Sequence, residues 1–542
     1  MLRLTEIKLA LDHDADDLRR AVSARLGLRP EDLVECRIFR QAVDARKKGS
    51  IMLVYTVDAV VKDEQRLSRR RKPATILSTP DLSYRPAVPG GEKLDRPPVV
   101  VGSGPAGLFA ALLLARQGFR PLLLERGKPV EERYRDVELF WSGGGLAVDS
   151  NMHFGEGGAG AFSDGKLTTL IHDPRCRKVL EEFVAAGADA DILYLNKPHL
   201  GSDRLPAIVR RIRQAIIDLG GEVRFHSRVD DLRIKEGKLT GVAVAGQGSQ
   251  EAQAVILAPG NSARDTFAML MERGVQLQAK PFSIGVRIEH PQAMIDDAQY
   301  GASAGHPRLG PADYKMFYHG PGGRSAYTFC MCPGGLVVAA ATEAGGVATN
   351  GMSLFARANA NANSALLVGV TPADFGSDHP LAGVEFQRMW ERKAFTLGGS
   401  DYFAPIQLVR DFLADYGRPL GGLADRSSTA LGDIQPTYRP GWRLARLADC
   451  LPDYVSETLR QALPFFAKRL PGFDRPDAVL TGVETRSSSP LRIVRNEAFE
   501  SNINGLYPAG EGAGYAGGIM SSAVDGMRAA EAIIRKHAPS SG

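Results

Sequence analysis

The first 62 residues show a hydrophobic pattern that predicts a small α/β module. Apolar residues recur along Leu2–Leu9 as in a strand, and Leu18, Val22 and Leu26, four residues apart, share one face of a helix. Two further apolar runs predict strands, over Leu33–Arg40 and over the β-branched segment Ile51–Val61. The pattern therefore predicts a βαββ order for residues 1–62.

A buried strand, a glycine-rich turn and a helix follow one another from Pro97. The successive parts are the strand Val99–Val101, a GxGxxG turn made by Gly102, Gly104 and Gly107 around Pro105, the helix Ala106–Gln117, the helix-ending Gly118 and the strand Leu122–Leu124. Glycines let a pyrophosphate approach the helix N-terminus, where free N–H groups and the positive end of the helix dipole favour an anion. This order predicts a dinucleotide site.

Glu125 and Arg126 come directly after the second strand of this unit. A carboxylate at that strand end is placed to accept hydrogen bonds from a ribose diol, and its negative charge disfavours a 2′-phosphate. We therefore expect Glu125 to contact the adenosine ribose.

Three later segments supply further candidate cofactor contacts. They are the glycine-rich loop at 152–167, with Gly155, Gly157, Gly158, Ser163, Asp164, Gly165 and Lys166; a predicted β-meander over Val223–Ile256, with Val229, that leads to the turn at Ala258 and Gly260; and the segment 505–537, with Gly510, Glu511, Gly517, Gly518 and Ile519 before a long helix. Loops with so many glycines can close over a pyrophosphate or a flavin ring through their amides. Together the segments favour FAD over NAD.

The 542 residues, 44% of them hydrophobic, suffice for several domains. The patterns divide the chain into the N-terminal module (1–62), a Pro-, Gly- and charge-rich linker (63–96), the first part of a dinucleotide-binding domain (97–260), an inserted substrate or cap domain (261–480) and the second part of the dinucleotide-binding domain (481–542). The predicted fold class is α/β, with a Rossmann-like domain and a small N-terminal α/β domain.

The net charge of +5 arises almost entirely between Lys62 and Arg96, where nine basic residues meet five acidic ones. Such a local excess, without interleaved aromatic residues for base stacking, disfavours nucleic acid as a partner. RNA binding through the basic residues of the N-terminal module and the linker, Arg37, Arg40, Arg46–Lys48 and Arg69–Lys72, stays open as an alternative.

Five cysteines without a CxxC pair argue against a disulfide scaffold and against a zinc ribbon, and the histidines have no metal-ligand spacing. No signal segment is visible, and the uncharged stretch Val99–Ala115 is shorter than the roughly 20 residues that a membrane-crossing helix needs. We expect a cytoplasmic protein with no metal and no membrane partner.

The chain resembles proteins with the FAD-binding fold of the glutathione-reductase type, and more closely a largely uncharacterised bacterial family of FAD-dependent dehydrogenases or oxidoreductases. The resemblance covers nearly the whole chain and rests on the motifs VVGSGPAGLFAAL, GEGGAGAFSDGKL, FCMCPGG, ETRSSSP and YPAGEGAGYAGGI. It implies non-covalent FAD. Glu511 stands where this fold usually has an Asp that binds the ribityl chain, and the amides around Gly518 and Ile519 are implied to face the flavin pyrimidine edge.

Cys330 and Cys332 are one candidate for redox chemistry. They lie on a predicted hairpin over Tyr327–Glu343 that turns at Pro333–Gly335, where period-two alternation puts both side chains on one face. Disulfide reductases of this fold carry a CxxxxC pair in the helix after the first FAD motif, and this chain has none. This absence favours small buried residues beside the flavin that are dispensable for electron entry, and a redox-active pair stays the alternative.

Arg486, within Glu484–Pro490, is the other catalytic candidate. A guanidinium beside three serine hydroxyls makes a good clamp for a carboxylate or phosphate, although the serines are equally suited to capping a turn before Pro490. We expect Arg486 to hold an anionic part of a substrate.

These features predict an FAD-dependent dehydrogenase or reductase that acts on a small-molecule substrate, with an electron-acceptor partner still to be identified. Only one GxGxxG turn, Gly102–Gly107, is followed by a helix, a second strand and an acidic residue, so NAD(P)H is expected only as a transient reductant at the substrate face. A flavin monooxygenase and an RNA-associated flavoprotein are the alternatives.

Overall fold

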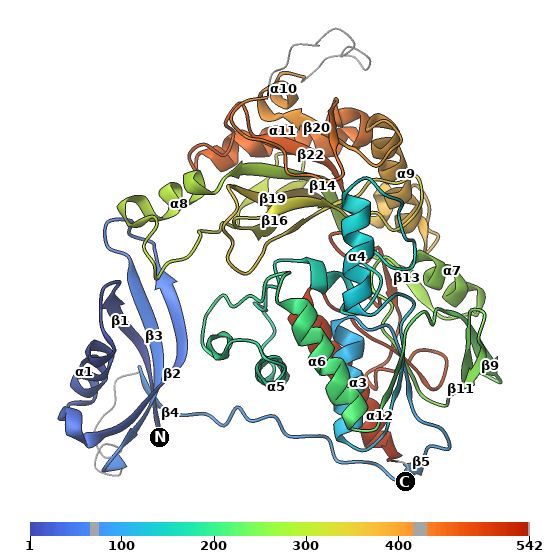
Figure 1. Cartoon of the computed structure of the whole chain (residues 1–542), viewed down its shortest axis with the longest axis horizontal. Coiled ribbons are helices and arrows are strands. Elements are labelled where there is room, and N and C mark those ends of the chain that lie inside the picture. Colours follow the sequence, from blue (N-terminus) through green and yellow to red (C-terminus); the bar gives the residue numbers. More distant parts are fainter. Residues whose placement is uncertain (65–74, 416–430, 540–542) are drawn as a thin grey trace.

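A five-stranded parallel sheet forms the centre of the lower right part of the molecule in the computed structural model, which describes residues 1–64, 75–415 and 431–539 (Figure 1). Its strands run in the order β24-β12-β6-β7-β8. Their bounds are β6 (Val99–Val101), β7 (Leu122–Leu124), β8 (Glu222–Arg224), β12 (Val255–Leu257) and β24 (Leu506–Pro508). Distant segments of the chain thus meet at one sheet, whose strand ends carry the glycine-rich turns.

The two faces of this sheet pack against different layers. Helices cover one face, namely α3 (Pro105–Arg116), α5 (Pro174–Ala185), α6 (Leu205–Asp218) and α12 (Ile519–Lys536). The antiparallel meander β9 (Val229–Lys235), β10 (Lys238–Val244) and β11 (Gly248–Glu251) covers the other with α7 (Arg264–Glu272). The meander predicted over Val223–Ile256 is therefore wrong at both ends, because β8 and β12 pair within the parallel sheet.

A seven-stranded sheet forms the second large body, at the top of Figure 1, in the order β15-β16-β19-β14-β22-β20-β21. The strands are β14 (Phe282–Pro291), β15 (Phe317–His319), β16 (Ser325–Cys332), β19 (Asn361–Val370), β20 (Ala404–Leu408), β21 (Trp442–Leu444) and β22 (Val479–Glu484). Helices α8 (Gln292–Tyr300), α9 (Ala382–Leu397), α10 (Val409–Ala414) and α11 (Asp453–Ala467) flank it.

The hairpin predicted over Tyr327–Glu343 is wrong. β16 pairs with β15 and β19, whereas the following strand β17 (Leu336–Ala339) pairs with β18 (Thr349–Met352) in a separate small sheet. Gly334 has a φ of +45°, and a Cβ there would lie 1.8 Å from the carbonyl oxygen of Arg357. The glycine thus serves a close crossing of two chain segments instead of a tight hairpin turn.

One further strand pairing and one helix connect the large bodies. The short strands β13 (Leu277–Ala279) and β23 (Leu491–Ile493) pair with each other where the chain enters and leaves the region of the seven-stranded sheet. Helix α4 (Val130–Trp141) spans both bodies, because the indole N–H of Trp141 donates to the carbonyl oxygen of Ala339 at 3.1 Å.

The N-terminal module has the predicted βαββ order, with one added strand. β1 (Leu2–Ala10), α1 (Ala15–Leu26), β2 (Leu33–Asp44) and β3 (Met52–Val61) are joined by β4 (Ile76–Ser78), and the sheet order is β2-β3-β1-β4. The module has its own apolar core. Together with the parallel sheet and its helices, it confirms the predicted α/β fold class.

The chain from 79 to 98 is largely exposed, and its β5 (Glu92–Lys93) pairs with the terminal β25 (His537–Ala538). The basic residues Arg69–Lys72 lie outside the described residues.

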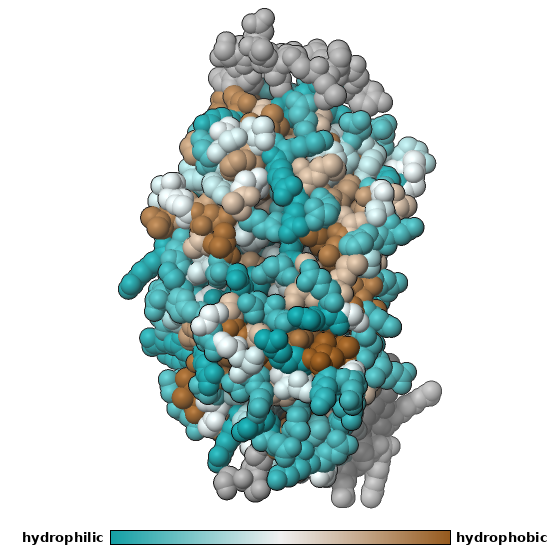
Figure 2. Space-filling view, turned by 90° about the vertical axis from the view of Figure 1, so that its right-hand side faces the viewer, coloured by the Kyte–Doolittle hydropathy of each residue, from teal (hydrophilic) through white to brown (hydrophobic). Residues whose placement is uncertain are grey.

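The face with α7, α9 and the meander is mostly hydrophilic, with hydrophobic side chains in small separate groups (Figure 2). Within the described ranges, no helix is both long and apolar enough to cross a membrane.

Candidate functional site

One cavity between the parallel sheet and the seven-stranded sheet collects most of the predicted site residues. Cys330 and Arg486 line it, and so do Gly102, Gly104, Pro105, Ala106, Glu125, Arg126, Gly155, Gly158, Ser163, Asp164, Gly165, Lys166, Val229, Ala258, Gly260, Gly510, Glu511, Gly517, Gly518 and Ile519. Gly107, Gly157 and Cys332 are not in its wall. The four glycine-rich segments, together with the segments of Cys330 and Arg486, therefore build a single site.

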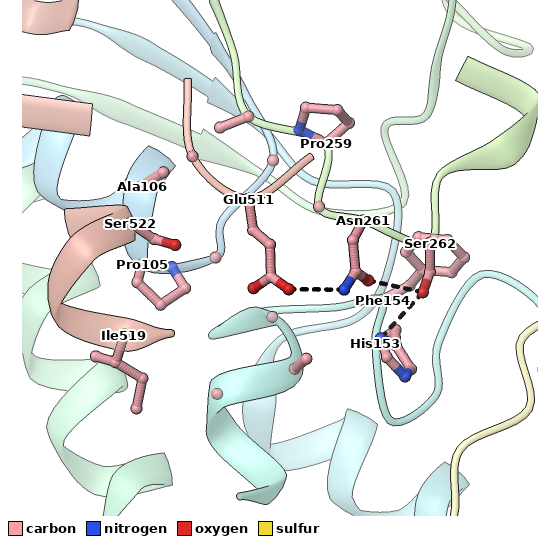
Figure 3. Close-up of a pocket in the computed structure, with 18 of the residues that line it drawn as sticks. Pro105, Ala106, His153, Phe154, Pro259, Asn261, Ser262, Glu511, Ile519 and Ser522 are labelled. Carbon is pink, nitrogen blue, oxygen red and sulfur yellow. Dashed lines mark hydrogen bonds between the residues drawn. The ribbon is translucent and has the colours of Figure 1, made fainter. Parts of the chain in front are cut away.

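The N-termini of two helices point into this cavity (Figure 3). α3 begins after Gly104 and α12 after Gly518, and neither helix has a side-chain cap. Their first N–H groups remain available to a ligand, and both dipoles favour negative charge. A Cβ at Gly517 or Gly518 would meet nothing within 4 Å, so open space lies in front of the α12 N-terminus. This donor set suits a dinucleotide with a central pyrophosphate and a ring that gains negative charge on reduction.

Gly104 and Gly107 have different structural roles in the GxGxxG turn. A Cβ at Gly107 would lie 1.8 Å from the carbonyl oxygen of Gly102, whereas a Cβ at Gly104 would make only an ordinary contact of 3.8 Å with Gly158. Gly104 faces the cavity and Gly107 faces the turn itself. The structure thus separates a glycine that leaves room for a ligand from one that lets the helix pack on its strand.

We expect Gly107→Ala to destabilise the protein and Gly104→Ala to leave it folded but without bound cofactor. At residue 107 the added methyl group overlaps the backbone of Gly102, which cannot move without disrupting the turn. At residue 104 the added methyl group instead occupies space that the ligand needs. Thermal unfolding of the cofactor-free proteins and absorbance of the purified proteins measure the two effects. Equal thermal midpoints for the two variants would contradict this division of roles.

Glu125 is buried and accepts four hydrogen bonds from the protein. Its Oε2 accepts from the amide and the hydroxyl of Ser103 at 2.8 and 2.6 Å, and its Oε1 accepts from the amides of Gly127 and Gly155 at 2.9 and 3.0 Å. The carboxylate therefore joins the glycine-rich turn to the loop at 155. Its contact with a ribose stays a prediction, but this internal role was not foreseen.

Asp164 and Lys166 form an ion pair in another part of the cavity wall. Asp164 pairs with Lys166 at 2.8 Å and with Arg357 at 2.6 Å. Against the effect of burial, these two cations lower the pKa of Asp164 to about 2. The Lys166 ammonium also donates to the carbonyl oxygen of Met331, so a hydrogen bond connects the ion pair to β16.

A chain of hydrogen bonds crosses the cavity from Glu511 to His153 (Figure 3). The Asn261 amide donates to Glu511 at 2.8 Å, the Ser262 hydroxyl lies 3.0 Å from the Asn261 side-chain oxygen, and 3.1 Å separates Ser262 from His153 Nδ1. Burial raises the pKa of Glu511 to about 7, although the Gly518 amide and Asn261 oppose it. Glu511 can thus hold or release a proton near neutral pH.

The end of the cavity under the seven-stranded sheet carries Glu484, Cys330 and Asn350. Arg287, fully buried below them, donates to both oxygens of Glu484 at 2.6 and 2.9 Å. Burial raises the pKa of Glu484 to about 7, and the positive charge of Arg287 opposes that shift. A second carboxylate that titrates near neutral pH therefore faces the cavity.

Arg486 reaches the cavity wall but is already paired. Its Nε and Nη2 donate to the two oxygens of Glu391 at 3.0 and 2.9 Å, and its Nη1 donates to Ser262 at 3.2 Å and to the Thr342 hydroxyl. The side chain is 6% exposed. Its role as a substrate clamp stays a prediction. Nη1 is the one guanidinium nitrogen that would be used, because it donates to two hydroxyl groups and not to a carboxylate.

Sequence reasoning missed several residues of this site, namely Ser103, His153, Asn261, Ser262, Arg287, Glu391 and Glu484. Ser103 and Asn261 had a local signal, because each adjoins a glycine of a predicted turn. The buried charges had none, since Arg287 and Glu484, or Glu391 and Arg486, come together only through the tertiary fold.

Three family models match the chain. They describe an FAD binding domain over residues 98–163, the C-terminal domain of an FAD-dependent protein over residues 281–487, and a domain of unknown function over residues 1–60. Two of the three matches lie on segments that line the cavity. They support FAD as the ligand that its donors fit.

An uncharacterised protein of Clostridium beijerinckii is 48% identical over 537 residues, which cover 99% of both chains. The protein FixC of Escherichia coli K12 is 30% identical over 210 residues, 37% of this chain and 44% of FixC. A geranylgeranyl bacteriochlorophyll reductase-like structure from Thermoplasma acidophilum covers 82% of this chain and 78% of its own at 13% identity and a TM-score of 0.34. Glycine oxidase from Bacillus cereus covers 81% and 98% at 11% identity and a TM-score of 0.31.

Proposed function

Because this chain belongs to a family of FAD-dependent oxidoreductases, we propose that it transfers a hydride between flavin N5 and a small-molecule substrate. FAD supplies the hydride chemistry, and the protein places the substrate and controls protons. The observation that carries the proposal is the single cavity that runs from the GxGxxG turn to the buried carboxylates below the seven-stranded sheet.

The order of the lining residues suggests how the ligand lies. The adenosine end would contact Glu125, Arg126 and Val229. The pyrophosphate would lie at the α3 N-terminus, and the ribityl chain would contact Glu511. The flavin would then lie between Lys166, the α12 N-terminus and the group formed by Glu484, Cys330 and Asn350. The positive end of the α12 dipole would stabilise the reduced ring.

Glu484 is the group that we propose to exchange a proton with the substrate. Hydride transfer to or from carbon is accompanied by a proton at a neighbouring oxygen or nitrogen in many substrates, and a pKa of about 7 suits that exchange at neutral pH. Arg287 fixes the carboxylate from below, so its free face is directed to the cavity. The substrate would bind between this group and the flavin.

The contacts of three arginines in the N-terminal module give no support to the RNA-associated alternative. Arg46 pairs with Asp44 at 2.6 Å, Arg37 pairs with Glu35, and Arg40 donates to Asn196. Nucleic-acid binding would need these cations to exchange their present partners for phosphates.

Anaerobic reduction of the purified flavoprotein against a panel of metabolites, with and without NADPH, tests the proposal. We expect one class of small molecule to bleach the flavin absorbance without oxygen. Glu484→Gln should slow that bleaching and reduce its pH dependence near 7, and unchanged FAD retention by the variant serves as the control. Bleaching that occurs only through NADPH, with substrate hydroxylation coupled to oxygen uptake, would instead identify a monooxygenase.

A further inference from the structure

Cys330 and Cys332 lie at a β-bulge that changes their relative position. In the pairing of β16 with β19, Phe329 faces Ala365 and Cys332 faces Asn363, so β16 contains one extra residue. Cys330 has a φ of +44°, in the left-handed region that non-glycine residues rarely adopt. The chain therefore turns sharply between the two cysteines, and the regular spacing of an extended strand does not apply.

The bulge brings the two cysteines into contact. The Cys332 thiol donates to the carbonyl oxygen of Cys330 at 3.3 Å, so the second side chain folds back over the first cysteine. Cys332 is fully buried, whereas Cys330 lines the cavity beside Glu484 and Asn350. Of the two cysteines, only Cys330 thus borders the proposed flavin position, and Cys332 adjoins it in the protein interior.

Two cations hold the backbone of this pair. Lys166 donates to the carbonyl oxygen of Met331, between the cysteines, and Arg287 donates to that of Cys330 at 3.1 Å. The hydrogen bond from Cys332, together with the charges of Lys166 and Arg287 and against the effect of burial, lowers the pKa of the Cys330 thiol. A thiolate beside a second thiol is the arrangement from which a disulfide forms.

We propose that Cys330 and Cys332 are a redox-active dithiol that exchanges an electron pair with the flavin. In the oxidising direction the S–H bond of Cys332 breaks and an S–S bond to Cys330 forms. The two electrons and the proton pass to oxidised FAD, which becomes the anionic reduced flavin. The reverse step returns a thiolate and a thiol, so the exchange needs no reactant besides the bound FAD. The proposal rests on the flavin position given under the proposed function.

The other cysteines provide matched controls. Cys450 is fully buried in the core of the seven-stranded sheet, where burial raises the pKa of its thiol to about 12. Cys36 is in the N-terminal module and Cys176 is on α5, and neither lines the cavity. A cysteine-to-serine change at 450 therefore removes a thiol without touching the proposed pair.

Anaerobic reductive titration of the air-oxidised holoprotein with dithionite measures the electron capacity per FAD. We expect about four electron equivalents for the wild type and for Cys450→Ser, and about two for Cys330→Ser and for Cys332→Ala, because flavin and disulfide each take two. Mass spectrometry after alkylation of the unfolded, air-oxidised protein should find Cys330 and Cys332 joined and the other three thiols alkylated. Retained flavin absorbance shows that each variant is folded.

Uptake of two electrons per FAD by the wild type, with Cys330 and Cys332 both alkylated after air oxidation, would overturn the dithiol. That result would leave the proposed hydride transfer intact, because the flavin itself would still be reduced. Failure of every metabolite to reduce the flavin would count against the proposed function alone, since dithionite needs no substrate.

Discussion

Replacing Glu391 with Ala is expected to lower the stability of the protein by about 3 to 5 kcal/mol, the range for removing one partner of a buried ion pair. Glu391 is 2% exposed and accepts hydrogen bonds from Arg264, from Arg486 and, at 2.6 Å, from the Thr485 hydroxyl. Without it, two buried guanidinium groups lose their counter-charge. Urea unfolding of the holoprotein, followed by flavin fluorescence and by far-ultraviolet circular dichroism, measures the loss.

Glu385 on the same helix is the matched control. Its side chain is 62% exposed and pairs with Arg388 one turn away, so Glu385→Ala should cost less than about 1 kcal/mol. A similar loss of stability for the two variants would show that the large effect expected for Glu391 does not come from the burial of its ion pairs.

Because Arg264 and Arg486 both pair with Glu391, Arg264 provides a control for the predicted role of Arg486 as a substrate clamp. Arg264 shares Glu391 with Arg486 but does not line the cofactor cavity. Lys cannot make the two-pronged contact with Glu391 at either position, so both Lys variants should lose stability. Only Arg486→Lys should also weaken substrate binding if Nη1 contacts an anion, and equal substrate affinities in the two variants would exclude the clamp.

The sequence predicts the parts of this molecule whose cause is local. The GxGxxG turn, its strand and its helix follow from glycine positions and hydrophobic runs within Val99–Leu124, and they occur within one residue of the expected bounds. The N-terminal βαββ order follows from the same kind of pattern. In both places neighbouring residues determine the backbone.

The errors occur where distant segments determine the local structure. The strand after Gly335 pairs with β18 because the chain crosses Arg357 at Gly334, a contact that no short pattern encodes. The bulge at Cys330 likewise depends on pairing with β19, and Arg287 holds it from β14. Alternation with period two consequently could not predict the extra residue between Phe329 and Cys332.

Glu125→Ala is expected to weaken FAD binding and also to destabilise the FAD-free protein. Its carboxylate is the acceptor for Ser103, Gly127 and Gly155, and hydrogen bonds to a charged group contribute about 1.5 to 3 kcal/mol each. Loss of even one such contribution from the cofactor site corresponds to roughly 10- to 150-fold weaker binding. Reconstitution of the FAD-free protein, followed by flavin fluorescence, gives the affinity, and its thermal midpoint gives the stability.

Glu182→Ala separates the two effects, because Glu182 is a buried acid of the same domain that pairs with Arg116 and Lys178 and does not line the cavity. It should lower the thermal midpoint without changing FAD affinity. Glu125→Gln should fall between the wild type and Glu125→Ala, since an amide oxygen can serve the donors on one side of the carboxylate but not on both. FAD affinity that is unchanged in Glu125→Ala would contradict a cofactor role, and an unchanged thermal midpoint would mean that the four internal hydrogen bonds do not hold the turn to the loop at 155.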